Sequence, residues 1–172
     1  CLHQAGESLP ISLNAVERAQ ARQFKDLRHR LEHYSRLDDL DEIRRVKRLG
    51  MRVTITAQME RSPGPNRDRR FPRYATLIRE GLEPVLISDS TGTIARASPL
   101  IGIAGVVAPQ SEGGWSPEGE APTLEQAVAM WTIWAARAQH EEAHKGSIEV
   151  GKLGDFVVLS GDIDRHPGGK LF

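Results

Sequence analysis

Residues 27–57 of the chain, LRHRLEHYSRLDDLDEIRRVKRLGMRVTITA, carry the clearest indication of the fold class. We expect a short strand over residues 27–33 and a second strand over residues 51–57, where β-branched side chains alternate with others. Between them the pattern predicts a helix over residues 38–49, with acidic residues in its first turn, basic residues in its last turn and Gly50 at its end. A strand, a helix and a second strand in this order predict two parallel strands joined by a crossover helix.

The same alternation continues on both sides of this unit. Toward the N-terminus, the last residues of a strand at His3 precede a helix expected over residues 11–22. Toward the C-terminus we expect a helix over residues 74–80, a strand over 84–88, a short helix over 99–107 within a long loop over 90–122, and a helix over 123–143. A hairpin is expected to follow over residues 146–160. This order predicts an α/β fold with about half of the strands of an eight-stranded (β/α) barrel.

Composition narrows the classes of function. The 172 residues carry 23 basic and 23 acidic side chains, so the chain lacks the basic excess of nucleic-acid-binding and membrane-surface proteins. No apolar run approaches the length of a membrane span. The single cysteine excludes an internal disulfide and a cysteine-based zinc site, and it fits a reducing, cytoplasmic location. Because the sequence opens on the end of a strand and not on Met, we expect a C-terminal piece of a longer protein.

Three side chains that can bind a metal end three of the predicted strands: His3, His33 and Asp89. The carboxyl ends of parallel strands meet at one rim of a barrel, so we expect the three to converge there. Two imidazoles and a carboxylate suit zinc, and a carboxylate beside such an ion can also transfer protons. The spacing alone is unspecific, because a histidine near a strand end is more often a packed or exposed side chain than a ligand. A divalent metal centre, with zinc as the expected ion, is therefore only one interpretation of these three residues taken by themselves.

Short sequence words around these residues resemble the amidohydrolase superfamily, in the family 3 branch that includes N-substituted formamide deformylase-like enzymes. The words are His3-Gln4-Ala5-Gly6-Glu7, Arg30-Leu31-Glu32-His33, Ile87-Ser88-Asp89, Thr123-Leu124-Glu125-Gln126-Ala127 and the stretch from Lys145 to Leu159, KGSIEVGKLGDFVVL. The last word is the most specific, although Glu7 and Gly154 stand where the family usually has Asp and Ala.

The resemblance implies the C-terminal half of a (β/α)8 barrel, strands five to eight, over residues 1–144. Residues 145–162 would supply the last strands of a small β-sandwich, and residues 163–172 would form a tail. It further implies metal ligands at His3, His33 and Asp89, with Asp89 also the catalytic acid and base, in a hydrolase that cleaves a carbon–nitrogen bond of a small amide or formamide.

The His-x-His of the family's first strand and the ligand of its middle strands do not occur in this sequence. The site would therefore need the N-terminal half of the barrel or a pairing chain. The alternative is a non-catalytic half-barrel that acts as a subunit or interaction module, or a degenerate relic. Its open sheet edges would invite pairing with another chain.

Other residues have competing interpretations. His140 and His144 spell H-E-x-x-H, but Gly146 ends the predicted helix too soon for a zincin site, so we expect a solvated helix end. Glu32 is expected on the face of the strand opposite His33, because neighbours alternate. Gln58 is either a substrate contact or an ordinary loop residue. We expect the Arg67–Arg70 cluster to be solubilising, Trp131 and Trp134 to lie in the core, and Cys1 to have no catalytic role.

Overall fold

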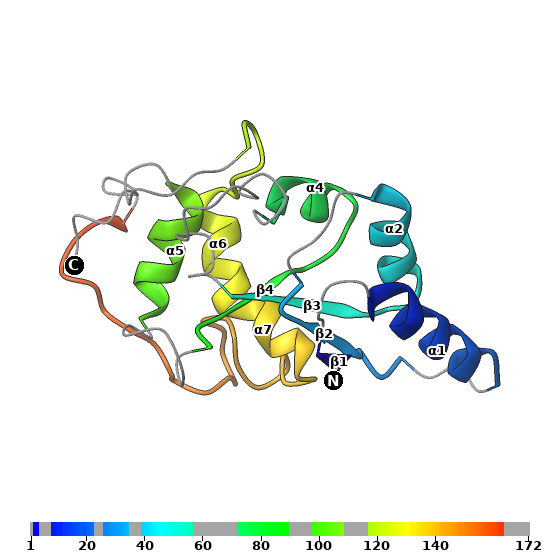
Figure 1. The fold of residues 1–172 in the computed structure, drawn as a ribbon. Coiled ribbons are helices and arrows are strands. Elements are labelled where there is room, and N and C mark those ends of the chain that lie inside the picture. The colour runs from blue at the N-terminus through cyan, green and yellow to red at the C-terminus, as the bar shows by residue number, and fades with distance from the viewer. Residues whose placement is uncertain are drawn as a thin grey trace.

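The computed structural model describes residues 2–3, 8–22, 26–34, 39–56, 72–89, 98–108 and 117–163, and at His3 only the backbone. Its centre is a four-stranded sheet in the order β1-β2-β3-β4. The strands are β1 (Leu2–His3), β2 (Arg30–Glu32), β3 (Arg52–Thr56) and β4 (Val85–Ile87). Every neighbouring pair is parallel, and the order places strands that follow one another in the sequence side by side (Figure 1). The parallel sheet predicted from residues 27–57 is confirmed.

The helices follow the predicted order. They are α1 (Leu9–Arg22), α2 (Leu40–Arg48), α4 (Tyr74–Arg79), α5 (Pro99–Val107), α6 (Leu124–Trp131) and α7 (Ile133–Ala138). Local capping explains two of their starts: the Asp39 side chain accepts from the Asp41 amide before α2, and Thr123 and Gln126 form a reciprocal capping box before α6. In the described parts of the chain, none of the helices has the length and apolar character that a membrane crossing requires.

The two faces of the sheet differ in chemistry. Leu31, Val53 and Ile55 belong to one buried cluster with apolar residues of all the helices up to α6. The residues between them on the strands, Arg30, Glu32, Arg52, Thr54 and Thr56, are polar and point to the other face. At β2 and β3 the helices therefore pack on the apolar face, and the polar side chains of these two strands lie on the opposite face.

The prediction of one continuous helix over residues 123–143 is wrong, because the structure has two shorter helices there. The predicted helix breaks at Thr132, whose φ of −122° and ψ of −98° are not helical, and it ends at Ala138. The Thr132 hydroxyl donates to the Val128 carbonyl at 2.8 Å, a local bond that competes with the helical pattern. A left-handed His140, with φ of 61°, follows the end of α7.

The two strands expected within residues 146–160 are absent from the described structure, where these residues form turns and extended backbone. Their apolar side chains face solvent: Val150 and Val158 are 108% and 84% exposed. A strand exists only when a neighbour satisfies its amides and carbonyls, and the described residues offer this segment no such neighbour. Figure 1 shows the segment in orange, running along the outside of the molecule.

A buried hydroxyl in the core gives a first prediction. Tyr34 is fully buried, and within the described residues its hydroxyl has no hydrogen-bond partner. Burial, and then the charges of Glu42 and Asp39, raise the pKa of this phenol. The Tyr34→Phe variant should therefore be as stable as the parent or more stable, by up to about 1–3 kcal/mol, the cost of an unsatisfied buried polar group. Urea denaturation measures this, and a clear loss of stability would reveal a partner for the hydroxyl.

Candidate active site

The predicted ligands lie at one rim of the sheet. His33 directly follows β2, Asp89 lies two residues beyond β4, and His3 is the last residue of β1. Because the strands are parallel, these positions share the carboxyl end of the sheet, and the backbone of His3 is in register with Glu32. The His3 side chain lies outside what the structure describes.

His33 and Asp89 come together in space, although α2, β3, α4 and β4 lie between them in the described parts of the chain. The Nδ1 atom of His33 lies 3.9 Å from Asp89 Oδ2 and 2.9 Å from the hydroxyl oxygen of Thr56, the last residue of β3. The His33 side chain is 20% exposed and that of Asp89 is 50% exposed. The imidazole is thus held against the sheet, while the carboxylate remains open to a small molecule.

Both side chains stand on unusual backbone. His33 has φ of 57° and Asp89 has φ of 47°, in the left-handed region that residues other than glycine rarely adopt. Such a residue does not continue the strand and turns its side chain away from the pleated alternation. Backbone of this kind clusters at functional sites, where the surrounding structure maintains it.

The prediction that Glu32 faces away from His33 is wrong. Glu32 accepts a hydrogen bond from the Thr54 hydroxyl, while His33 contacts Thr56, and these two threonines lie on the same face of β3. The left-handed turn at His33 explains the difference, because it brings His33 back to the face that Glu32 already occupies. Burial opposes ionisation of Glu32, but the hydrogen bonds from Thr54 and Arg30 outweigh it and lower the pKa of the carboxyl.

The described donors fit part of a divalent metal site. An imidazole and a carboxylate meet at one place on the rim, and both are ordinary zinc ligands. Within the ranges the structure describes, no three histidine, cysteine, aspartate or glutamate side chains are grouped closely enough to hold an ion. His33 and Asp89 therefore form a pair to which His3 is the predicted third ligand.

Several predicted residues lie outside the described parts of the chain: Cys1, Gln58 and the Arg67–Arg70 cluster. Trp131 and Trp134 are partly buried against the core, as predicted. Sequence reasoning missed Thr54 and Thr56. The available signal was their spacing, since two hydroxyls two residues apart in a predicted strand must share one face of it.

A family model described as the amidohydrolase family matches residues 3–168. The chain belongs to the amidohydrolase family. No curated protein sequence matches it. The predicted family is thus confirmed, while the formamide deformylase-like branch remains a prediction.

Solved structures with a similar fold include two metal-dependent hydrolases and an adenosine deaminase. An uncharacterized metal-dependent hydrolase from Pyrococcus furiosus is 23% identical with a TM-score of 0.75, over 96% of this chain and 33% of that one. A second, from Pyrococcus horikoshii OT3, is 21% identical with a TM-score of 0.74, over 97% and 34%. An adenosine deaminase from Xanthomonas campestris with bound zinc is 18% identical with a TM-score of 0.64, over 90% and 35%. The chain spans about a third of the length of these proteins.

The H-E-x-x-H word of this amidohydrolase-family chain is not a zincin site. Residues 139–144 follow α7 as turns, so His140 and His144 are not one helical turn apart on a helix. The Nε2 atom of His140 lies 3.4 Å from the Leu27 carbonyl, at the opposite end of the sheet from His33. The interpretation as a solvated chain segment at a helix end is consistent with these positions.

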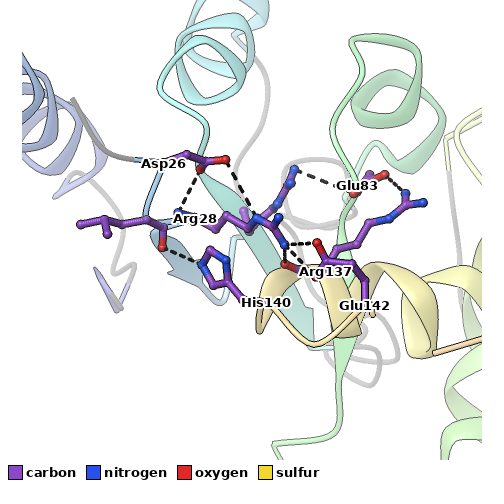
Figure 2. Close-up of polar contacts among 8 residues, drawn as sticks. Asp26, Arg28, Glu83, Arg137, His140 and Glu142 are labelled. Carbon is purple, nitrogen blue, oxygen red and sulfur yellow. Dashed lines mark hydrogen bonds and ion pairs between the residues drawn. The ribbon is translucent and has the colours of Figure 1, made fainter. Parts of the chain in front are cut away.

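Figure 2 shows a second polar cluster, which the sequence did not predict, near the amino ends of the strands. Arg28 donates to the Arg137 carbonyl at 2.5 Å and to Glu142 at 2.9 Å, and Glu83 pairs with Arg137 and, at 3.8 Å, with Arg52. A backbone hydrogen bond, and then Arg28, hold the pKa of Glu142 below its ordinary value. The cluster connects the segment after α7 to the amino ends of β2, β3 and β4. It therefore stabilises the fold at the end of the sheet opposite the candidate site.

Proposed function

We propose that this chain supplies part of the active site of a metal-dependent hydrolase that cleaves non-peptide carbon–nitrogen bonds in small amides or formamides. One observation carries the proposal: in an amidohydrolase-family chain, His33 and Asp89 meet on left-handed backbone at the carboxyl rim of a parallel sheet. This rim is where (β/α) barrels carry their catalytic residues.

Each candidate residue has a distinct role in the proposal. His3 and His33 hold a divalent ion, which we assign as zinc, together with Asp89. When bound, such an ion lowers the pKa of a water molecule and polarises a carbonyl oxygen. Asp89 is half exposed, so its carboxylate can also take a proton from the attacking water and pass it to the leaving nitrogen. Gln58, which follows β3 in the sequence, is the proposed substrate contact.

The substrate class and the remaining architecture extend the proposal. We assign the chain to the N-substituted formamide deformylase-like branch, with residues 1–144 as barrel strands five to eight. Residues 145–162 would complete a β-sandwich, which accounts for the exposed apolar side chains of that segment. The other half of the barrel, in the same protein or in a pairing chain, would supply the remaining ligands.

A non-catalytic half-barrel is the second candidate. It is favoured by the two edges that β1 and β4 form in the described sheet. An edge strand presents unpaired amides and carbonyls that another chain can use. This candidate predicts assembly without metal binding.

Zinc binding to the purified chain distinguishes these possibilities. We expect the chain to bind zinc, and the His33→Ala and Asp89→Ala variants to bind it more weakly by more than the roughly 10–100-fold that loss of an outer-sphere partner costs. The matched control is His144→Ala, which removes an exposed imidazole far from the rim and should leave the affinity unchanged. Calorimetric titration with zinc measures all four proteins.

Three outcomes contradict the proposal. Equal affinities for the parent and His33→Ala would exclude His33 as a ligand. Loss of zinc in His144→Ala with retention in Asp89→Ala would point to the H-E-x-x-H word. A chain that binds no zinc and forms stable assemblies through its sheet edges would be the non-catalytic half-barrel.

A further inference from the structure

We propose that Thr56 is a positioning residue that fixes the tautomer of His33, with the proton on Nδ1 and the lone pair on Nε2. The consequence for metal binding rests on the proposed function, but the tautomer itself is a property of this chain alone. No sequence motif indicated a role for Thr56. Its contact with Nδ1 of His33 gives the two ring nitrogens of that histidine separate roles.

Thr56 is built into the sheet. It is the last residue of β3, it is 2% exposed, and its backbone is in register with Ile87 of β4. The β-branched side chain has few rotamers, so the hydroxyl has little freedom to move away. The 2.9 Å contact between Thr56 Oγ1 and His33 Nδ1 therefore joins the imidazole to a rigid part of the sheet.

The direction of this hydrogen bond follows from a second oxygen close to the same ring nitrogen. Asp89 Oδ2 lies 3.9 Å from the same Nδ1 atom. An ionised carboxylate can only accept hydrogen bonds, so a lone pair on Nδ1 would face negative charge. A proton on Nδ1 instead can be donated to the hydroxyl of Thr56 at 2.9 Å and lies favourably near the carboxylate of Asp89 at 3.9 Å. The surroundings thus favour the Nδ1–H tautomer, in which Thr56 accepts.

The tautomer decides which atom can bind a cation. A neutral imidazole has one lone pair, and it lies on the nitrogen that carries no proton. With Nδ1 protonated, that atom is Nε2. Hydrogen bonds to the other ring nitrogen orient metal-binding histidines and select their tautomer in general. A neutral histidine in water instead favours the proton on Nε2, so the effect of Thr56 should be measurable without any metal.

The neighbouring threonine provides a matched control. Thr54 lies on the same strand and face, is 3% exposed, and donates its hydroxyl proton to Glu32 and not to His33. Thr54→Val and Thr56→Val remove the same hydroxyl group from the same strand. Only the second is expected to change the ring of His33.

The experiment is nitrogen NMR of the metal-free chain with ¹⁵N-labelled histidine, recorded at about pH 8.5, roughly two units above the ordinary pKa of an imidazole. The His33 signals are identified by their absence in His33→Ala. We expect the parent, Thr56→Ser and Thr54→Val to show His33 mainly as Nδ1–H. In Thr56→Val the signals should move toward the Nε2–H form.

The outcomes separate this inference from the proposed function. A parent chain with His33 as Nε2–H overturns the inference even if no Thr56 variant folds, and so does a Thr56→Val variant that keeps the parent tautomer. Zinc titration then tests the consequence, a loss of roughly 10–100-fold in Thr56→Val that Thr56→Ser restores. If the tautomer changes as expected while the parent binds no zinc, the role of Thr56 stands and the proposed function fails.

Discussion

The Leu31→Ala variant should lose about 2–5 kcal/mol of its free energy of unfolding, the range for removing most of a buried leucine. Leu31 is fully buried at the centre of β2, in register with Leu2 of β1 and Val53 of β3, and it belongs to the core cluster. Neighbours on both sides are fixed by strand pairing, so the cavity cannot close easily. Urea denaturation followed by circular dichroism measures the change.

Leu27→Ala is the matched control. The same atoms are removed from a leucine that is 55% exposed and precedes the same strand. Its effect should stay within about 0.5 kcal/mol, as for surface substitutions in general. Similar losses in both variants would mean that the apolar face of the sheet does not form the core, and the described packing would be wrong.

Gly146→Ala is expected to cause the second large loss, about 2–5 kcal/mol. Gly146 has φ of 96°, and a Cβ atom there would lie 2.8 Å from the Cβ of Ala136 and 2.9 Å from the Cα of Ile133. Left-handed backbone costs an alanine about 1–2 kcal/mol, and overpacking against a helix adds about 1–3 kcal/mol. Urea denaturation measures the global effect, and limited proteolysis reports whether residues 139–163 leave α7.

Gly151→Ala separates these two contributions. Gly151 has nearly the same φ, 92°, but in the described structure no atom beyond its chain neighbours would lie within 4 Å of a Cβ at this position. It should therefore show only the backbone cost. If Gly151→Ala and Gly146→Ala are equally destabilised, the close approach to α7 is not what requires glycine in the Lys145-Gly146-Ser147 word.

Local signals in the sequence account for most of the predicted elements. The acids before α2, the capping box before α6 and the β-branched run of β3 act on neighbouring residues, so their effects can be read without tertiary structure. The rim location of His33 and Asp89 also followed, because a parallel sheet brings the ends of its strands to one side. Their roles as ligands, like that of His3, stay predictions.

Long-range contacts explain the failures. Residues 146–160 have strand-like composition but no neighbouring strand in the described structure, and composition cannot supply hydrogen-bond partners. The cluster around Arg28 joins residues more than a hundred positions apart, which no local pattern records. At Thr132 the backbone leaves the helical conformation and the hydroxyl bonds to the Val128 carbonyl, although the residues on both sides favour a helix.

The alternation of strands and helices and the chemical type of the side chains at the strand ends follow from local sequence, because both depend on residues close together in the chain. That Glu32 and His33 share a face, and that Thr56 contacts the imidazole, became visible only in the folded chain. Both features depend on the left-handed backbone of His33 and on the pairing of β2 with β3. Neither a backbone angle nor a strand register can be deduced from the type of a single residue.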